Sequence, residues 1–399
     1  MPANDPPFYP VPRSCPLHPS EALADLQALS PLTKVQIWNE QPAWLVTRHA
    51  ELLQLLVDPR LSVNSERQGY PSANLAAAQM REQFPTFLQM DAPEHQILRR
   101  MVASDFSVKK SEARRAEIDE IVKDALESLL QLTPPVDFIE EFALVVPSMV
   151  IARILGVPYK DHKFFQSRSH TFTSSNSTPE EIRVATGEMR EYLTELVTSK
   201  NREPGDDLLS RLVVKHMRTG ELSLDQVVAH ARLLLAGGHD TTASMIGLGM
   251  LALLLYPDQR SLLANDRTHM RNAVEEMLRF TTITHIGRRR VATSDISIGE
   301  VTIKAGEGVI ADAFIGNRDP RVFEDPDSFD IDRDTRAHIA FGYGPHQCIG
   351  QNLARVELQV VFNQLLDKIP TMRLAVDFEE LRFKESAIIY GLEALPIAW

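Results

Sequence analysis

The sequence predicts a mainly α-helical protein with small β-sheets, and we expect residues 1–399 to form a single domain. Three observations lead to this fold class. Apolar residues recur at helical spacing through most of 50–280. A long helix is marked between 223 and 257, and short strand-like segments follow it. Many helices with a few small sheets are typical of one large α-rich domain.

The N-terminal third opens with a proline-rich leader, residues 1–20. Residues 34–38 and 43–47 are rich in strand-forming side chains around a short turn, and they predict a β-hairpin. The polar segments 66–84 and 166–178 predict loops that either cover a substrate or are ordinary surface.

Two capping boxes mark helix starts. Thr178 and Glu181 enclose Pro179, a residue favoured at the first helical position. Ser223 and Gln226 open a pattern that runs to residue 256, and at about 1.5 Å per residue this makes a helix of roughly 50 Å. Such a helix is long enough to cross the whole domain.

Residues 288–312 combine β-branched side chains with glycines and predict short strands and turns. A helix is predicted again over 351–369, and the tail 381–397 predicts further strands.

Composition excludes several classes of function. The formal charge of −12 argues against nucleic acid as a partner. The leader has no apolar run, and the longest apolar stretches contain charged residues, so we expect no signal peptide and no membrane anchor. Two cysteines give no disulfide framework, which favours a cytoplasmic protein. We further expect a monomer.

Cys348 is the most informative residue. It lies in Phe341-Gly342-Tyr343-Gly344-Pro345-His346-Gln347-Cys348-Ile349-Gly350, immediately before the predicted C-terminal helix. Glycines let the backbone approach a large flat ligand, and a helix N-terminus lowers the pKa of a thiol. An incidental free cysteine is the plain alternative. The surrounding pattern favours a metal-binding thiolate.

The long helix contains Ala236-Gly237-Gly238-His239-Asp240-Thr241-Thr242. Adjacent glycines cost about 1 kcal/mol each relative to alanine in a helix. Polar side chains inside an apolar helix also need partners. We interpret the glycines as a place for a flat ligand and expect a threonine hydroxyl to bond the carbonyl four residues earlier. A close crossing of two helices is the alternative.

These motifs resemble those of the cytochrome P450 family, the haem-thiolate monooxygenases, in the soluble bacterial class. Asn317-Arg318-Asp319-Pro320 and Phe323-Glu324-Asp325-Pro326 also match, so the resemblance covers nearly the whole chain from about residue 44. It is closest to the branch that hydroxylates secondary metabolites and xenobiotics. The resemblance implies the triangular, α-rich prism of that family, with the long helix at its centre.

The resemblance also implies residue roles. Cys348 would ligate the iron of haem b, and O2 would be the cosubstrate. Asp240 and Thr241 would relay protons and hold oxygen, Thr242 would share the hydroxyl role, and His239 occupies a variable position. The further residues implied to bind or contact haem are His95, Arg99, Ala236, Gly237, Arg290, Phe341, Gly342, His346 and Gly350. The substrate would be an apolar small molecule such as a macrolide, terpenoid, steroid-like compound or xenobiotic.

A third motif has a structural role by resemblance. Glu276 and Arg279 lie three apart on one helix face and can pair. The family buries this pair and adds an arginine from a later segment, which here corresponds to Arg333.

The sequence has no Gly-x-Gly-x-x-Gly fingerprint, so electrons from NAD(P)H must arrive through another protein. We expect a ferredoxin with its reductase. The segment 99–115 is basic in an acidic protein, and Arg355 adds to it. Such a patch would steer an acidic ferredoxin, or it is a solvated helix face.

Three alternatives remain. Arg67-Gln68-Gly69-Tyr70-Pro71 is similar to nitric oxide reductases of the same fold, but those enzymes lack the acid–alcohol pair. Peroxide-driven members replace that pair with arginine and proline. A haem-binding gas sensor would not need Asp240 and Thr241.

Overall fold

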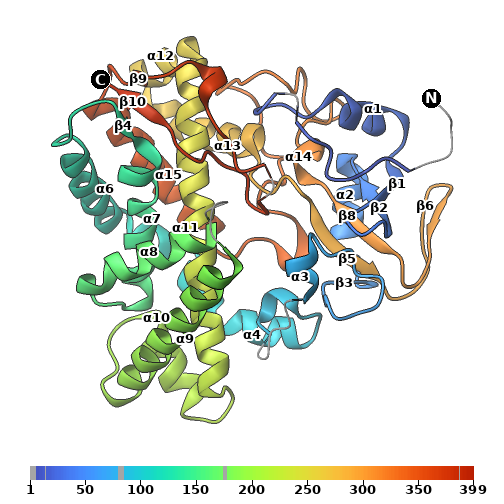
Figure 1. Ribbon diagram of the computed structural model, residues 1–399, viewed down its shortest axis with the longest axis horizontal. Coiled ribbons are helices and arrows are strands. Elements are labelled where there is room, and N and C mark those ends of the chain that lie inside the picture. The colour runs from blue at the N-terminus through green and yellow to red at the C-terminus, as the bar shows by residue number, and fades with distance from the viewer. Residues whose placement is uncertain (1–5, 14, 80–84, 174–177, 386) are drawn as a thin grey trace. The chain divides into compact units, whose positions relative to one another are not determined.

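The computed structural model describes residues 6–13, 15–79, 85–173, 178–385 and 387–399. The protein is mainly helical with small sheets (Figure 1). The chain divides into two compact units. The first is made of Met1–Ile97 and Leu278–Cys348, and the second of Leu98–Met277 and Ile349–Trp399. That the two units behave as one domain stays a prediction.

The first unit is built on a five-stranded sheet of order β1-β2-β8-β5-β3. The predicted hairpin is confirmed as antiparallel β1 and β2, with Leu32 opposite Val46. β2 pairs in parallel with β8, which comes much later in the sequence, and the remaining pairs are antiparallel. The strands are β1 (Leu32–Gln36), β2 (Pro42–Val46), β3 (Leu61–Ser62), β5 (Arg288–Ala292) and β8 (Gly308–Ala311).

Both faces of this sheet are buried, because alternate residues of its strands belong to different apolar clusters. Val46 of β2 packs with Leu52 of α2 on one face. Leu45 packs with Leu23 of α1 and with Tyr9 of the leader on the other. The accompanying elements are α1 (Glu21–Leu29), α2 (His49–Leu56), α3 (Leu75–Gln79), α14 (Ala313–Gly316) and the two-stranded ribbon of β6 (Ile296–Ile298) and β7 (Val301–Ile303).

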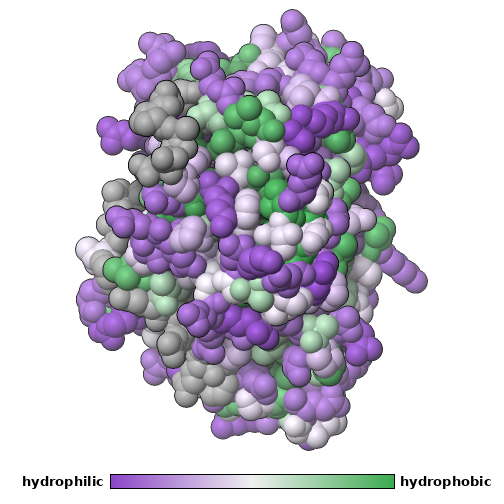
Figure 2. Space-filling view, turned by 90° about the vertical axis from the view of Figure 1, so that its right-hand side faces the viewer, coloured by the Kyte–Doolittle hydropathy of each residue, from purple (hydrophilic) through white to green (hydrophobic). Residues whose placement is uncertain are grey.

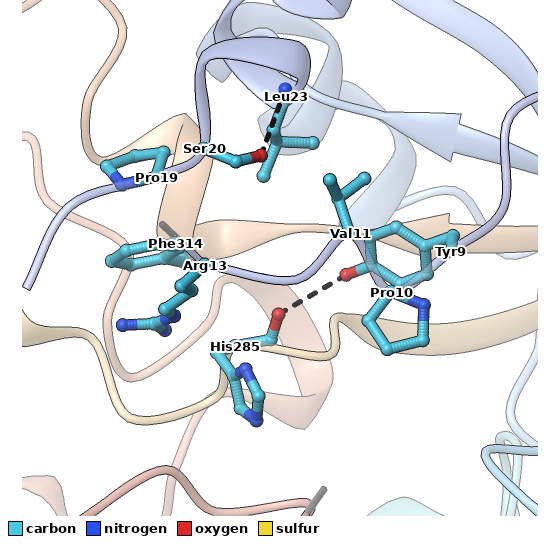
Figure 3. A pocket seen from close by; sticks show the side chains of 9 residues that line it. All are labelled: Tyr9, Pro10, Val11, Arg13, Pro19, Ser20, Leu23, His285 and Phe314. Atoms are coloured by element: carbon cyan, nitrogen blue, oxygen red, sulfur yellow. Dashed lines mark hydrogen bonds between the residues drawn. The ribbon is translucent and has the colours of Figure 1, made fainter. Parts of the chain in front are cut away.

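The leader is fastened to the first unit by Tyr9. Its hydroxyl donates to Asp312 at 2.8 Å. The same hydroxyl contacts the carbonyl of His285 at 3.4 Å (Figure 3). Burial raises the pKa of Tyr9 well above its ordinary value and raises the pKa of Asp312 to about 6. The hollow beside Tyr9 has room for about one water molecule, so it takes no larger ligand.

The second unit is organised around α11 (Leu224–Leu255), which has the predicted start at the Ser223 capping box and the predicted length of 32 residues. It packs against α7 (Val145–Leu155), α9 (Pro179–Arg202) and α15 (Gln351–Lys368) (Figure 1). The other helices are α5 (Val108–Ala113), α6 (Arg115–Leu129), α8 (His162–Thr173), α10 (Leu208–Leu212) and α12 (Pro257–Asn265). The chain passes between the units within α4 (Glu94–Ala103) and α13 (Met270–Thr281).

The loop predicted over 166–178 is wrong for its first part, because α8 extends to Thr173. Tertiary packing outweighs the polar sequence. Phe165 is 1% exposed and meets the ring of Tyr192 on α9 edge-on, with centroids 4.9 Å apart. Arg168 of α8 pairs with Glu188, which also lies on α9. Residues 174–177, and 80–84 of the other predicted loop, lie outside the described residues.

The C-terminal tail forms fewer strands than predicted. β10 (Pro396–Ala398) lies between β4 (Val136–Asp137) and β9 (Arg373–Leu374) in a small sheet. Further back, Phe383 and Leu392 form an isolated bridge.

Polar and charged side chains dominate the face shown in Figure 2, with apolar ones gathered mainly along a central strip. Across the described residues, we find no helix with the length and apolar character needed to span a bilayer.

Candidate functional site

The cysteine loop is a tight turn in the first unit. Gly342 and Gly344 have φ angles of +77° and +75°, which favour glycine. The amide of Cys348 donates to the carbonyl of Phe341 at 2.9 Å and closes the loop. A Cβ atom at Gly344 would lie 2.8 Å from the side chain of Val57. The thiol of Cys348 is exposed, so the loop presents sulfur to a ligand instead of burying it.

Arg288 on β5 lies against this loop. Its Nη2 donates to the carbonyl of Ala340 at 2.8 Å, and its Nε is 3.0 Å from where a Cβ atom at Gly342 would stand. Its Nη1 is buried and has no hydrogen-bond partner among the described residues. Burial, and then the charge of Arg290, lower the pKa of Arg288 to about 10, while Cys348 and Asp312 act in the opposite direction. This guanidinium is therefore suited to an anionic group.

Two of the predicted haem-binding residues, His95 and His346, come together. Their ring centroids are 4.0 Å apart, and His95 is 2% exposed. The start of α4 is held by Asp91, which accepts hydrogen bonds from the Ser62 hydroxyl at 2.5 Å and from the Val63 amide at 2.9 Å. This anchoring fixes where His95 stands in the first unit.

Arg290 points to the same face of β5 as Arg288, because side chains two apart in a strand share a face. Burial lowers the pKa of Arg290, while the nearby Tyr70 and Asp91 oppose that shift. Its Nη1 donates to the carbonyl of Arg289 at 2.7 Å. The structure thus gathers positive charge on this face of the strand. Arg99 lies on α4, four residues after His95, and is half-buried.

In the second unit, α11 has an exposed stretch in the middle of an otherwise buried helix. Ala236 and Gly237 are exposed, although Leu234 and Leu235 before them are buried. Of the neighbouring polar residues, Asp240 and Thr241 are half-buried, whereas Thr242 is 6% exposed. Thr242 is therefore less accessible than Thr241 for a shared hydroxyl role. His239 is 1% exposed, which fits a side chain accommodated in the core.

The expected side-chain bond back to the helix is present. The hydroxyl of Thr241 donates to the carbonyl of Gly237 at 2.6 Å. This bond gives the hydroxyl a fixed place on the exposed side of α11.

The two glycines have different neighbours. Among the described residues, a Cβ atom at Gly237 would meet nothing within 4 Å, which leaves the backbone open to a flat ligand. A Cβ atom at Gly238 would lie 3.0 Å from the side chain of Ile151 on α7. The helix-crossing interpretation is confirmed at Gly238, whereas ligand binding at Gly237 stays a prediction that its open backbone allows.

Asp240 forms an ion pair that the sequence did not indicate. Lys384 from the C-terminal tail places its Nζ 3.4 Å from Oδ1 of Asp240. The two side chains are 10% and 15% exposed.

The Glu276–Arg279 motif is buried, as expected for a structural role. Both residues lie on α13 and are 0% exposed. Arg279 donates to the carbonyls of Asn317 at 2.9 Å and of Ser328 at 3.1 Å. The predicted third member, Arg333, also donates to Ser328, at 3.3 Å.

The predicted basic patch is smaller than its sequence count. Arg115 pairs with Glu112 at 2.9 Å, and Arg355 pairs with Glu275 at 2.6 Å. Lys109 and Lys110 of α5 are exposed. These two lysines are the positions best suited to contact an acidic partner.

The residues present fit a haem. An iron porphyrin needs an axial ligand, donors for its two carboxylates and open backbone against its flat face. The first unit offers the exposed thiol of Cys348 together with the basic face of β5, including the orphaned Nη1 of Arg288. The second unit offers the open backbone at Gly237. Each unit, taken by itself, therefore carries features that suit a thiolate-ligated haem.

Comparisons with known proteins agree. A profile of the family described as Cytochrome P450 matches residues 61–369. The chain is 45% identical to Cytochrome P450-SU2 of Streptomyces griseolus, covering 96% of this chain and 94% of the relative. It is 43% identical to Vitamin D3 dihydroxylase of the same organism, covering 99% and 98%.

Among solved structures, mycinamicin VIII C21 methyl hydroxylase from Micromonospora griseorubida, bound to mycinamicin VIII, superposes with a TM-score of 0.91. It is 40% identical, with 98% of this chain and 100% of that chain covered. The chain belongs to the cytochrome P450 family, in the branch that hydroxylates secondary metabolites, and it is a monooxygenase that uses thiolate-ligated haem and O2.

Sequence reasoning missed two residues of the site. Arg288 was detectable as one of three consecutive arginines in a strand, where alternation puts two of them on one face. Lys384 gave no signal, because only the folded tail brings it to Asp240.

Proposed function

We propose that this cytochrome P450 hydroxylates an apolar small molecule of secondary metabolism, such as a macrolide, terpenoid, steroid-like compound or xenobiotic. In the balanced reaction, one C–H bond and O2 are converted, with two electrons and two protons, to a C–OH group and water. The electrons come from NAD(P)H through a ferredoxin reductase and a ferredoxin. We also propose that the enzyme acts as a cytoplasmic monomer.

Two similar proteins support the substrate class. One is named for the dihydroxylation of vitamin D3, and the other is a methyl hydroxylase solved with mycinamicin VIII. A hydroxylase of the same branch requires a pocket that excludes water around such a substrate.

We assign haem binding to Cys348 as iron ligand and to donors for the carboxylate arms. The proposed contacts are His95, Arg99, Ala236, Gly237, Arg290, Phe341, Gly342, His346 and Gly350. When bound, the haem supplies the chemistry of oxygen activation, and the protein supplies orientation, a dry environment and proton timing.

The observation that carries a monooxygenase assignment is the acid–alcohol pair on the exposed side of α11. The Thr241 hydroxyl is held on the Gly237 carbonyl at 2.6 Å, and from there it could turn outward and donate a proton on the exposed side of α11. The Asp240 carboxylate, one residue away, can pass protons to it. Nitric oxide reductases and peroxide-driven members of this fold lack this pair, so their reactions are the less suitable alternatives.

The exposed lysines of α5 support a ferredoxin as electron donor. Lys109 and Lys110 present two positive charges in a protein of net charge −12, which favours an acidic partner and a salt-sensitive encounter. Reversing both charges to glutamate should lower the rate of reduction by an added ferredoxin at low salt. Arg336→Glu, at an exposed position where the arginine already pairs with Asp334, serves as the control.

The experiment that tests the function uses the purified haem protein with a bacterial ferredoxin and reductase. Compounds are first screened for a shift of the iron from low to high spin. Those that bind are then turned over under 18O2, and one labelled oxygen atom in the product supports the proposal. Turnover with peroxide alone, or consumption of nitric oxide with a nicotinamide, would favour the alternatives.

A separate measurement tests the ligand. The reduced, carbon-monoxide-bound protein should show the absorption band of a thiolate-ligated haem, and Cys348→Ser should lose it. An unchanged spectrum in that variant would contradict the assignment.

A further inference from the structure

We propose that Lys384 is a positioning residue that holds Asp240 in place for proton delivery and ties it to the C-terminal tail. This inference rests on the proposed proton role of Asp240. The inference adds to the proton-delivery residues one that lies far from them in the sequence. It also gives the C-terminal tail the role of positioning Asp240.

The ion pair lies where water screens it little. Nζ of Lys384 is 3.4 Å from Oδ1 of Asp240, and the two side chains are only 10% and 15% exposed. Exposed ion pairs are weak because water and salt screen them. Removing one member of a largely buried pair destabilises the protein, because the remaining charge is poorly solvated. Removing the ammonium group would therefore take away one of the contacts that set the position of this carboxylate.

The backbone around Lys384 is fixed by a short hairpin. The amide of Lys384 donates to the carbonyl of Gly391 at 2.9 Å. On the outer side, Phe383 bridges Leu392, and the amide of Glu393 donates to the carbonyl of Arg382 at 2.9 Å. The hairpin therefore sets the position from which the lysine side chain reaches α11.

The same hairpin rests directly on α11. A Cβ atom at Gly391 would lie 2.7 Å from Oγ of Ser244, closer than real Cβ contacts. Ser244 is one helical turn beyond Asp240 and so shares its face of α11. Gly391 thus seats the hairpin at a fixed distance from the helix, and Lys384, bonded to Gly391 through its backbone, faces Asp240.

This arrangement links the tail to the oxygen-activating residues. Ile388, between the two flanks of the hairpin, is 54% exposed and is accessible to a bound molecule. A molecule that contacts Ile388 contacts the same hairpin that carries Lys384. The carboxylate that passes protons is thereby held by the segment that meets the substrate.

The test uses the haem protein with a surrogate ferredoxin system and a compound that shifts its spin state. The share of electrons released as hydrogen peroxide is measured for Lys384→Met, Lys384→Arg, Asp240→Asn and the double variant Lys384→Met/Asp240→Asn. Lys123→Met, at a 61% exposed position, is the matched control.

We expect Lys384→Met to raise the peroxide share at least threefold and to lower kcat with little change in KM. Lys384→Arg should restore most of the coupling, since it keeps the charge. In the Asp240→Asn background, the methionine substitution should add no further effect. An additive effect in the double variant would overturn the proposal, because Lys384 would then act independently of Asp240.

A second readout needs no turnover. The melting temperatures of the wild type, Lys384→Met, Asp240→Asn and their double variant form a cycle, and the loss in the double variant should be smaller than the sum of the single losses. Strict additivity would show that no pair exists and would overturn the inference. Gly391→Ala, which displaces the hairpin, should raise the peroxide share as Lys384→Met does.

The outcomes separate the two levels of the argument. If Asp240→Asn turns over with normal coupling, the proton role of Asp240 fails and the positioning role fails with it. If Asp240→Asn leaks peroxide while Lys384→Met remains fully coupled, the proposed function stands and the inference on Lys384 alone is wrong.

Discussion

The side chain of Arg288 has a buried hydrogen-bond donor that is unsatisfied among the described residues. Its Nη2 donates to the carbonyl of Ala340 at 2.8 Å, while Nη1 is buried without a hydrogen-bond partner among the described residues. Leaving a buried charged donor unsatisfied costs free energy that a bound anion would recover. A carboxylate arm of a bound haem would be such an anion.

We therefore predict that Arg288→Leu weakens haem retention. The loss of one charge-assisted hydrogen bond corresponds to roughly 1.5–3 kcal/mol, which is on the order of a tenfold or greater change in haem dissociation. Transfer of haem to an excess of apomyoglobin measures it. The rate of haem transfer from Arg288→Lys should lie between those of the wild type and Arg288→Leu. Arg336→Leu, at an exposed position, should transfer haem as slowly as the wild type. Equal transfer rates for all four proteins would rule out this role.

At Thr241, the prediction concerns coupling and leaves haem binding intact. Thr241→Ala removes the hydroxyl that donates to Gly237 at 2.6 Å, so protons should be delivered without control. We expect most of the electrons to appear as hydrogen peroxide while the haem content stays normal. Peroxide release per NAD(P)H consumed is the measurement, with Thr186→Ala on α9 as the control, since its hydroxyl donates to the carbonyl of Ile182 at 2.7 Å in the same way. Tight coupling in Thr241→Ala would contradict the proton role.

Single residues were predictable where the sequence carries a local penalty. Cys348 in its glycine frame and Thr241 beside paired glycines both stand out from sequence alone. Lys384 did not, because its significance depends on a contact between distant segments. Arg288 is an intermediate case. Strand alternation predicts which face of the sheet it lies on, but it does not predict that the cysteine loop lies beside it.

At the scale of the helix, the glycines of α11 separate packing from ligand access. A Cβ atom at Gly249 would lie 2.7 Å from the ring of Phe362, whereas one at Gly237 would meet nothing within 4 Å. The same substitution at the two positions should therefore have opposite effects on stability.

We predict that Gly249→Ala destabilises the protein by about 1–3 kcal/mol through overpacking. Gly237→Ala should leave unfolding unchanged or stabilise it by up to about 1 kcal/mol, because alanine favours helix. Urea unfolding monitored by circular dichroism measures both. Gly237→Ala should still lose haem faster than wild type, since its backbone is less open. A Gly249→Ala protein as stable as wild type would show that Phe362 moves aside freely.

Elements with local start signals were predicted well. The capping boxes at Thr178 and Ser223 are confirmed with both of their hydrogen-bonded arms. The hairpin of β1 and β2 is also confirmed. The helix α8 was missed because its stability comes from Phe165 packing on α9, and the parallel partner of β2 was missed because no local pattern specifies a pairing across such a separation.

For the whole molecule, buried carboxyl groups set how stability responds to pH. Glu357 on α15 is 2% exposed, and burial raises its pKa to about 8. The folded protein binds this proton more tightly than the unfolded chain does. The stability that the protonated form contributes is full below about pH 4.5 and is lost as the pH rises through 8. Asp312, with a pKa raised to about 6, acts in the same direction at lower pH.

We predict that Glu357→Gln flattens this dependence. The wild type should lose about 2–4 kcal/mol of unfolding free energy between pH 6 and 9 from this group, and the glutamine variant should lose less. Urea midpoints of the haem protein at both pH values provide the measurement. Glu379→Gln, at an exposed position, is the control. A variant with the same pH slope as wild type would show that Glu357 does not titrate in this range.

The neighbouring glycines at 237 and 238 finally bear on how such a helix can change over generations. Because the nearest atoms to a Cβ at Gly238 belong to Ile151, a larger residue there becomes more tolerable once 151 shrinks, and the two positions should covary among descendants. Position 237 has no such protein neighbour to compensate for it. Its small size should persist for as long as the lineage keeps its prosthetic group.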